Sequence, residues 1–253
     1  DMDGTIYRGN ALFSCTIPFL KFLKSRGIGY AFLTNNSSTS TANYIARLAS
    51  MGIAVEPANL YTSTHYAIDY LRKHLPECRR LYLLGESEIV PEFEAAGFIV
   101  TGEEPQAVVV AFDRRLTYER LCRAAWLMRN GVPAFATHPD PFCPSDRPEW
   151  LIDCGAICAC LEKSTGVKLK ILGKPDPALL CDAARARGIS DMSEVLMIGD
   201  RLATDIALGI NAGSLPCHIA DPGAESELEE ANGIRPDYTV QSLAHLQQFW
   251  QSI

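Results

Sequence analysis

The chain opens with Asp1-Met2-Asp3-Gly4-Thr5, two carboxylates one residue apart followed by a glycine. Such a pair can supply a nucleophile and an acid/base partner, because the second carboxylate reaches atoms that the first cannot. A plain Asp-Gly turn is the alternative, since both residues are common in tight turns. The choice between the two depends on what the rest of the chain provides.

A calcium-binding loop is a further alternative for the same segment, and its spacing excludes it. That loop needs an acidic or amide residue, a glycine and a glutamate at positions where this chain has Thr5, Ile6 and Leu12.

Composition is that of a globular protein large enough for one sizeable core and a smaller second unit, with 253 residues and 47% hydrophobic residues. The net charge of -7 argues against broad binding of nucleic acid or of an anionic membrane, which needs clustered Lys and Arg. No apolar run is long enough to span a membrane. Any anionic substrate must therefore be held by local groups.

Nine cysteines without a C-x-x-C pair indicate reduced thiols and a cytoplasmic protein. Cys154, Cys158 and Cys160 are the densest group and raise the alternative of a zinc site. Their spacing does not match that of zinc ligands and no histidine is close in sequence, so we expect Cys154 and Cys158 on the buried face of a helix.

Short apolar runs rich in β-formers alternate with amphipathic stretches, which predicts an α/β fold with a Rossmann-like, doubly wound parallel sheet. We expect strands over 29–33, 81–84, 107–112, 134–137, 169–172 and 195–198. We expect helices over 17–25, 41–50, 64–74, 88–95, 117–129, 177–187 and 203–211.

Polar residues follow three of these strands directly, namely Thr34, Lys174 and Asp200. Ligands bind at the carboxyl edge of an open α/β sheet, so these groups converge if their strands are neighbours. By the same reasoning an apolar strand should precede Asp1. We therefore expect the natural chain to continue upstream of it.

The ordered set of motifs resembles the haloacid dehalogenase superfamily of phosphatases. Within it, the chain resembles the branch that contains NagD, the 4-nitrophenylphosphatases and the animal pyridoxal phosphate and phosphoglycolate phosphatases. This resemblance covers nearly the whole chain. The matching segments are Asp1-Met2-Asp3-Gly4-Thr5, Thr34-Asn35-Asn36-Ser37, Gly173-Lys174-Pro175-Asp176-Pro177 and Gly199-Asp200-Arg201-Leu202-Ala203-Thr204-Asp205.

The resemblance implies a Mg²⁺ ion, which prefers oxygen ligands and offsets the charge of a phosphoryl group. Asp1 and Asp200 would supply carboxylate oxygens and Asp3 its backbone carbonyl, while Asp205 would act mainly by supporting the ligands. A turn and a favourable charge at a helix N-terminus remain alternative explanations for Asp200 and Asp205.

The resemblance also assigns catalytic roles. Asp1 would form an aspartyl-phosphate, and Asp3 would protonate the leaving oxygen and then deprotonate the attacking water. Lys174 would pair with Asp1 and the phosphate, although a lysine before a proline is by default a surface residue.

Thr34, Asn35 and Asn36 would bind phosphate oxygens through a hydroxyl and backbone N–H groups at the start of a helix. An ordinary N-cap is the alternative explanation for Thr34.

About 135 residues separate the second and third motifs, far more than the usual connection in α/β units. We therefore predict a core domain over 1–76 and 169–253, with an inserted αβ cap over 77–168 that determines substrate specificity. A cap of this kind excludes water and admits substrate by hinge motion.

The segment 136–144 follows a predicted strand and is too rich in proline for a helix or an interior strand. It resembles the substrate-specificity loop of the family, so His138, Asp140 and Cys143 are candidate substrate contacts. In the animal pyridoxal phosphate phosphatase this loop presents a histidine where this chain has Cys143, which argues against that substrate. A solvated loop side chain is the alternative for His138.

The resulting hypothesis is a Mg²⁺-dependent hydrolase of a small phosphate monoester such as a sugar phosphate, a nucleotide or phosphoglycolate. Phosphoryl transfer of the phosphomutase type and a non-catalytic regulatory module are the alternatives. The sequence leaves the oligomeric state open, a homodimer included.

Overall fold

The computed structural model describes residues 1–143, 149–220 and 233–252, and the chain divides into two compact units. Unit 1 comprises Asp1–Thr34, Ile45–Tyr61 and Lys174–Ile253, and unit 2 comprises Asn35–Tyr44 and Thr62–Gly173. Unit 2 contains all of the expected cap, 77–168, and also takes in 35–44, 62–76 and 169–173, which the sequence assigned to the core. The chain therefore crosses between units at other positions than those expected.

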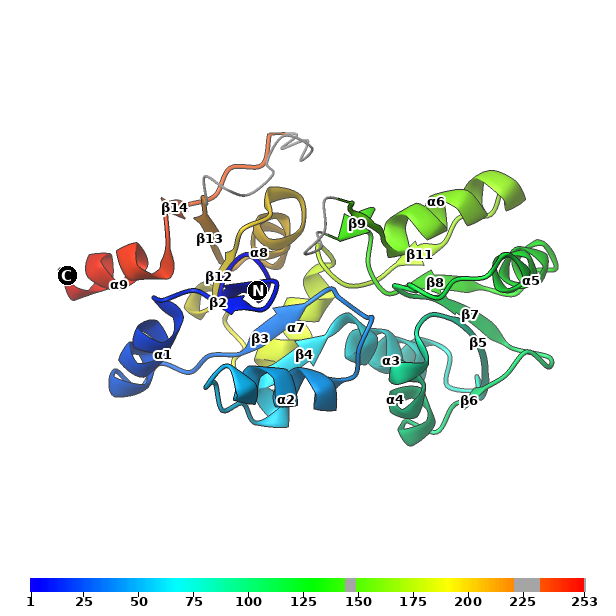
Figure 1. Cartoon of the computed structure of the whole chain (residues 1–253), viewed down its shortest axis with the longest axis horizontal. Coiled ribbons are helices and arrows are strands. Elements are labelled where there is room, and N and C mark those ends of the chain that lie inside the picture. The colour runs from blue at the N-terminus through cyan, green and yellow to red at the C-terminus, as the bar shows by residue number, and fades with distance from the viewer. Residues whose placement is uncertain (144–148, 221–232, 253) are drawn as a thin grey trace. The chain divides into compact units, whose positions relative to one another are not determined.

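Unit 2 is built on a five-stranded parallel sheet in the order β11-β8-β7-β5-β6. Its strands are β5 (Arg80–Leu84), β6 (Ile99–Val100), β7 (Ala107–Val110), β8 (Ala134–Ala136) and β11 (Lys170–Ile171). Helices α5 (Tyr118–Arg129) and α6 (Cys154–Thr165) lie along one face of this sheet, and α3 (Ser63–His74) and α4 (Val90–Ala95) lie along the other (Figure 1). The doubly wound α/β architecture is confirmed.

The strands of unit 2 are continuous apolar runs in the sequence, and their burial explains this pattern. All four residues of β7 are fully buried, because helices cover both faces of the sheet. Leu127 and Leu161, from α5 and α6, pack against the strands in the same cluster as Cys154 and Cys158. The two cysteines thus lie on the buried face of α6, as expected.

Unit 2 also carries a short antiparallel pair, β9 (Phe142–Cys143) and β10 (Leu151–Ile152). The rings of Phe142 and Trp150 stack with their centroids 4.5 Å apart beside this pair. Pro144, the last residue of the expected specificity loop, lies outside the described residues.

Unit 1 contains a parallel sheet in the order β12-β13-β14 and a separate pair, β3 with β4. The strands are β12 (Leu196–Gly199), β13 (Leu215–Ile219), β14 (Tyr238–Val240), β3 (Phe32–Thr34) and β4 (Leu60–Thr62). The helices are α1 (Thr16–Ser25), α2 (Thr41–Ser50), α7 (Pro177–Arg185), α8 (Ala207–Ala212) and α9 (Leu243–Gln251). The division into units passes through α2 and β4.

Two short elements of unit 1 flank the polar motifs. An antiparallel hairpin, β1 (Tyr7–Arg8) and β2 (Ala11–Leu12), follows the N-terminal motif. The expected helix over 203–211 begins with a π-helical turn over Leu202–Ile206 and continues as α8. Neither the hairpin nor the strands β13 and β14 were anticipated, because two-residue strands carry no period and β13 contains Pro216.

The strand expected over 169–172 exists as β11, but it belongs to the sheet of unit 2, where it pairs with β8. Lys174 therefore follows a strand of one sheet, whereas Asp200 follows β12 of another. These two strands are therefore not neighbours in one sheet, which was the condition given for the convergence of the polar residues.

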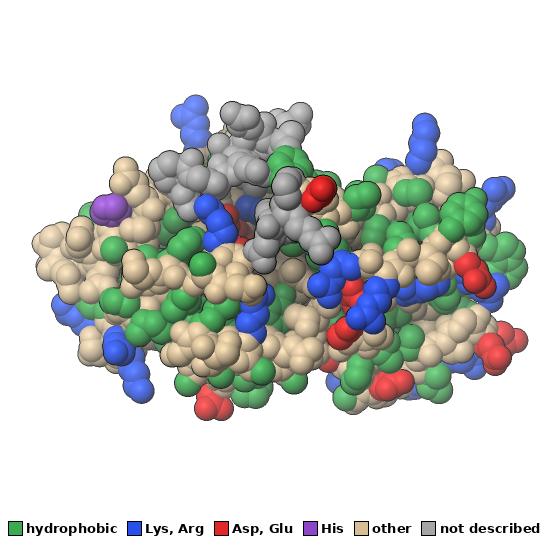
Figure 2. All heavy atoms as spheres, viewed as in Figure 1, with side chains coloured by type: hydrophobic (Ala, Val, Ile, Leu, Met, Phe, Trp, Pro, Cys, Tyr) green, Lys and Arg blue, Asp and Glu red, His purple; other side chains and the backbone are tan. Residues whose placement is uncertain are grey.

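The surface carries charge of both signs. On the face drawn in Figure 2, Lys and Arg side chains are interspersed with Asp and Glu side chains, with no broad basic surface. Among the described residues, every helix is too short or too polar to cross a membrane.

Candidate active site

The first six residues fold into a tight loop that presents two acidic side chains. The backbone N–H groups of Thr5 and Ile6 donate to the carbonyl of Met2 at 3.2 and 2.9 Å, and the N–H of Gly4 donates to the carbonyl of Tyr7 at 2.8 Å. The loop is anchored by three buried side chains, those of Met2, Ile6 and Tyr7. It therefore has the shape of a turn, and its apolar side chains fix it in the core.

Asp1 lies beside the end of β12. Its backbone nitrogen donates to the carbonyl of Ile198 at 2.9 Å, and its carboxylate accepts a hydrogen bond from the Thr5 hydroxyl at 3.1 Å. This places the Asp1 side chain at the carboxyl edge of the unit 1 sheet, next to Asp200 and Asp205, as expected.

Lys174 is buried and bridges two carboxylates. Its Nζ lies 2.5 Å from Oδ1 of Asp1 and 2.6 Å from Oδ1 of Asp205. The second oxygen of Asp205 accepts the N–H of Arg201 at 3.2 Å. Burial alone would raise the pKa of Asp205, but the Lys174 ammonium outweighs it and the pKa is lowered. Asp205 thus stays ionised and holds Lys174 against Asp1.

Asp200 is the third carboxylate of this group. Burial raises its pKa to about 7, and the neighbouring charge of Asp205 adds to the rise. Its Oδ1 is buried and makes no hydrogen bond with any described residue. Ligand atoms of Asp1, Asp200 and Asp205 lie within 4.8 Å of one another. An unsatisfied carboxylate oxygen in a group of three carboxylates, two of which pair with one ammonium, fits a hard divalent cation.

Asp3 is exposed, whereas Asp1 and Asp200 are partly buried and Asp205 is buried. Desolvation nevertheless raises its pKa, and the guanidinium groups of Arg47 and Arg201 oppose the rise. Arg47 donates from Nη2 to the carbonyl of Gly9 and stacks over the Tyr7 ring, 4.7 Å from its centroid. Sequence reasoning missed Arg47, because a basic residue in the last turn of a helix is commonplace.

The residues of the second motif are divided between the units. Thr34 ends β3 in unit 1 and is buried, and Asn35 and Asn36 begin the next segment in unit 2. The Asn36 side chain accepts from the N–H and hydroxyl of Ser38 at 2.9 and 2.7 Å, which is a local turn. Asn35 is buried and donates from Nδ2 to Oδ2 of Asp140 at 3.2 Å.

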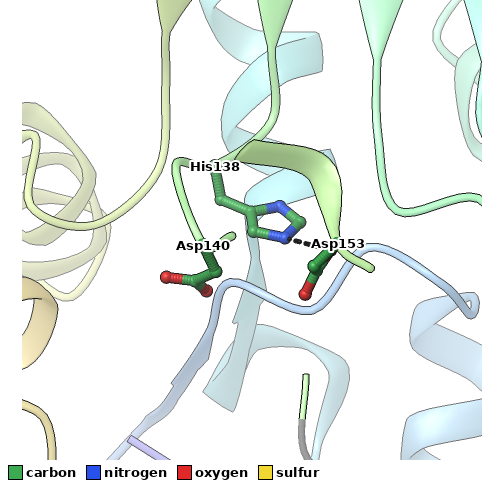
Figure 3. Close-up of side chains that lie close together, drawn as sticks. All are labelled: His138, Asp140 and Asp153. Atoms are coloured by element: carbon green, nitrogen blue, oxygen red, sulfur yellow. Dashed lines mark hydrogen bonds and ion pairs between the residues drawn. The ribbon is translucent and has the colours of Figure 1, made fainter. Parts of the chain in front are cut away.

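His138 is fully buried and is not a solvated loop side chain. Its Nε2 lies 3.0 Å from Oδ1 of Asp153, and its Nδ1 lies 2.9 Å from the Thr137 hydroxyl. Figure 3 shows the imidazole with its Nε2 turned toward Asp153, and Asp140 on the other side of it. Asp140 is also buried, and Cys143 is partly exposed on β9. Substrate contact from His138, Asp140 or Cys143 stays a prediction.

Asp153 is a second residue that sequence reasoning missed. It caps the N-terminus of α6, accepting the Cys154 N–H at 2.6 Å through the same oxygen that faces His138. An aspartate just before a helical stretch is a recognisable capping signal. Its ion pair with a histidine fifteen positions away has no sequence signal.

Family models match both ends of the chain. Residues 1–99 match the model described as Haloacid dehalogenase-like hydrolase, and residues 171–246 match a second one described as HAD-hydrolase-like. The chain belongs to the HAD-like hydrolase family. The resemblance inferred from the motifs is confirmed, and the chain is an enzyme, a hydrolase of the phosphatase type.

Relatives span nearly the whole chain. An acid sugar phosphatase of Staphylococcus aureus (strain MRSA252) is 32% identical over 244 residues, which cover 96% of this chain and 93% of that protein. A 4-nitrophenylphosphatase from Thermotoga maritima superposes with a TM-score of 0.90 at 36% identity, covering 98% and 94% of the two chains. A glycerol phosphate phosphatase from Mycobacterium tuberculosis, in complex with magnesium, superposes with a TM-score of 0.86 at 27% identity. The match covers 98% of this chain and 76% of that one.

Gly4 is a position where any side chain should disrupt the site. Its φ is +79°, and an added Cβ would lie 1.9 Å from Oδ2 of Asp200. We expect Gly4→Ala to displace Asp200 and to lower kcat by ~100-fold or more, as measured in steady-state assays. Gly27→Ala is the matched control, because Gly27 has a φ of +67° but open space around it. Equal losses in both variants would assign the effect to backbone strain alone.

The buried His138–Asp153 pair should make stability depend on pH. Burial by itself lowers the pKa of His138, but Asp153, then Cys154 and Asp140, raise it to about 9 from an ordinary 6.5. Because the pKa of His138 is raised in the folded state, protonated His138 makes its full contribution to the free energy of unfolding below about pH 6.5. That contribution is lost as the pH rises through about 9.

This contribution is on the order of 3 kcal/mol. We expect the free energy of unfolding to fall more between pH 7 and pH 10 in the wild type than in His138→Gln, as measured by urea denaturation. Parallel pH profiles for the two proteins would show that His138 is neutral when folded.

Proposed function

We propose that the chain is a Mg²⁺-dependent phosphatase that hydrolyses a small phosphate monoester through an aspartyl-phosphate at Asp1. The observation that carries the proposal is the contact of Asp1 with buried Lys174 at 2.5 Å, beside the unsatisfied oxygen of Asp200. A carboxylate nucleophile needs positive charge at the phosphoryl group, and these groups are arranged to provide it.

In the first step, an Asp1 carboxylate oxygen attacks phosphorus and the bond to the ester oxygen breaks. Asp3 donates its proton to the departing oxygen, and its raised pKa suits this role. In the second step, water attacks the phosphorus of the phosphorylated Asp1, the bond between phosphorus and the Asp1 oxygen breaks, and Asp3 takes the proton of that water. The products are an alcohol and inorganic phosphate, and both carboxylates return to their starting states.

The remaining residues position the phosphoryl group. The Lys174 ammonium would neutralise its oxygens, and Asp205 keeps that ammonium directed at Asp1. Thr34 would bind the same oxygens at the end of β3. Asp1, Asp200 and the backbone carbonyl of Asp3 would hold Mg²⁺, which when bound offsets the negative charge of the phosphoryl group.

Two relatives support a proposal for the substrate class. Their names refer to sugar phosphates and glycerol phosphate, which share a polyhydroxy leaving group. We therefore propose a sugar or polyol phosphate as the substrate. We also propose a cytoplasmic location, because all nine cysteines are free thiols.

Removing the nucleophile should abolish turnover without unfolding the chain. We expect Asp1→Asn to lower kcat by at least ~10³-fold, because a carboxamide cannot form the aspartyl-phosphate. Circular dichroism should show a native spectrum. Asp182→Asn is the matched control, since Asp182 pairs with Arg185 at the surface of α7. An Asp1→Asn enzyme with near-normal Mg²⁺-dependent activity would contradict the mechanism.

A substrate panel should separate hydrolysis from transfer. We expect sugar and polyol phosphates to give the highest kcat/KM among sugar phosphates, nucleotides, phosphoglycolate and pyridoxal phosphate, with activity lost on adding EDTA. Inorganic phosphate should form in equal amount to the alcohol. A phosphorylated acceptor in place of inorganic phosphate would establish a transferase, and no turnover of any ester would favour a non-catalytic module.

A further inference from the structure

The buried polar residues after β8 form one connected set that the reaction does not use directly. His138 contacts Asp153 through Nε2 and Thr137 through Nδ1, at 3.0 and 2.9 Å. Thr137 and His138 are fully buried, and Asp153 is nearly so. Burying an ion pair costs free energy unless all of its donors and acceptors have hydrogen-bond partners. We therefore expect this pair to have a role other than packing in the core.

One arm of this set reaches the segment that follows Thr34. The Thr137 hydroxyl lies 3.0 Å from the Ser37 hydroxyl, which also accepts the N–H of Phe112 at 3.0 Å. Two residues earlier, Asn35 donates to Asp140, in the same loop as His138, at 3.2 Å. Both ends of 35–37 are thereby tied to 137–140.

A second arm reaches the segment that precedes Lys174. The N–H of Leu172 donates to the carbonyl of Ala136 at 2.8 Å. Gly173 has a φ of +77°, and an added Cβ would lie 2.4 Å from the Thr137 carbonyl oxygen and 3.3 Å from Cβ of His138. The chain packs against the backbone of 137–138 and then continues directly into Lys174.

We propose that the His138–Asp153 pair is a positioning element of the phosphoryl-transfer site, which rests on the function proposed above. The pair fixes the loop 137–140, and this loop fixes the covalent neighbours of Thr34 and of Lys174. Neither His138 nor Asp153 touches the reacting atoms. Their effect on the reaction is to limit the positions that a phosphate-binding hydroxyl and an ammonium can adopt, where an error of 1 Å costs about 100-fold in rate.

A metal ion is the competing explanation, because ligand atoms of His138, Asp140 and Asp153 lie within 4.8 Å of one another. The ion pair already uses the Nε2 that a metal would need, and Asp140 accepts from Asn35. The geometry therefore favours the ion pair.

The test compares His138→Ala with Leu161→Ala, a matched loss of core packing in the same unit that leaves the set intact. With 4-nitrophenyl phosphate and Mg²⁺, below the melting temperature of every variant, we expect His138→Ala to lower kcat ~10-fold or more with little change in KM. Leu161→Ala should stay within about twofold of wild type despite a similar loss of stability.

Two milder variants keep the test decisive if His138→Ala fails to fold. His138→Gln retains a donor toward Asp153 and should recover most of the lost kcat. Ser37→Ala removes only the contact between the Ser37 and Thr137 hydroxyls, and it should lower kcat by about threefold to tenfold. Equal kcat in His138→Ala and Leu161→Ala would overturn the proposal. A change confined to KM would do the same and would restore His138 as a direct substrate contact.

Hydrogen exchange provides a readout that does not depend on activity. We expect faster amide exchange in 34–37 and 172–174 in His138→Ala than in Leu161→Ala. Unchanged exchange there would overturn the proposal, even if the wild type proves inactive and the proposed function fails. Elemental analysis that finds one divalent ion per chain, lost in His138→Ala, would establish the metal site instead.

Discussion

The buried ammonium of Lys174 is the interaction on which the active site depends. A buried lysine is tolerated only when carboxylates surround it, and Asp1 and Asp205 do so at 2.5 and 2.6 Å. Once both are committed to Lys174, Asp200 is left with an oxygen that no described protein group satisfies. The fit of this group of carboxylates to a divalent cation thus follows from how the lysine is neutralised. Asp205 itself contacts the Lys174 ammonium and accepts the backbone N–H of Arg201.

Lys174 also shows the limit of what the sequence can place. It follows β11, whose hydrogen bonds belong to the sheet of unit 2, but Lys174 itself begins the last segment of unit 1, where its ammonium contacts Asp1 and Asp205. The sequence predicted the strand and the polar residue after it, but it placed that strand in the wrong sheet. A two-residue strand has no pattern that reveals its neighbours, because strand pairing is set by hydrogen bonds between segments far apart in sequence.

His138 illustrates the same limit for a single side chain. Its setting among prolines and an aspartate predicts an exposed loop, and the loop itself is present. The residue is buried because Asp153 and Thr137 satisfy both ring nitrogens. A buried histidine without such partners would be costly, so the difference between solvated and structural roles lies in a residue fifteen positions along the chain.

The α/β class, the family and the candidate acidic and basic groups could be predicted from the sequence, because they depend on residue type, spacing and local periodicity. The turn at Asp1-Met2-Asp3-Gly4-Thr5 also follows from local preferences, since Gly4 has a positive φ. Three further features required the folded structure: the sheet that contains β11, the packing of Arg47 on Tyr7, and the pairing of His138 with Asp153. These outcomes depend on burial and on contacts between distant segments, which take effect only when the whole chain has folded.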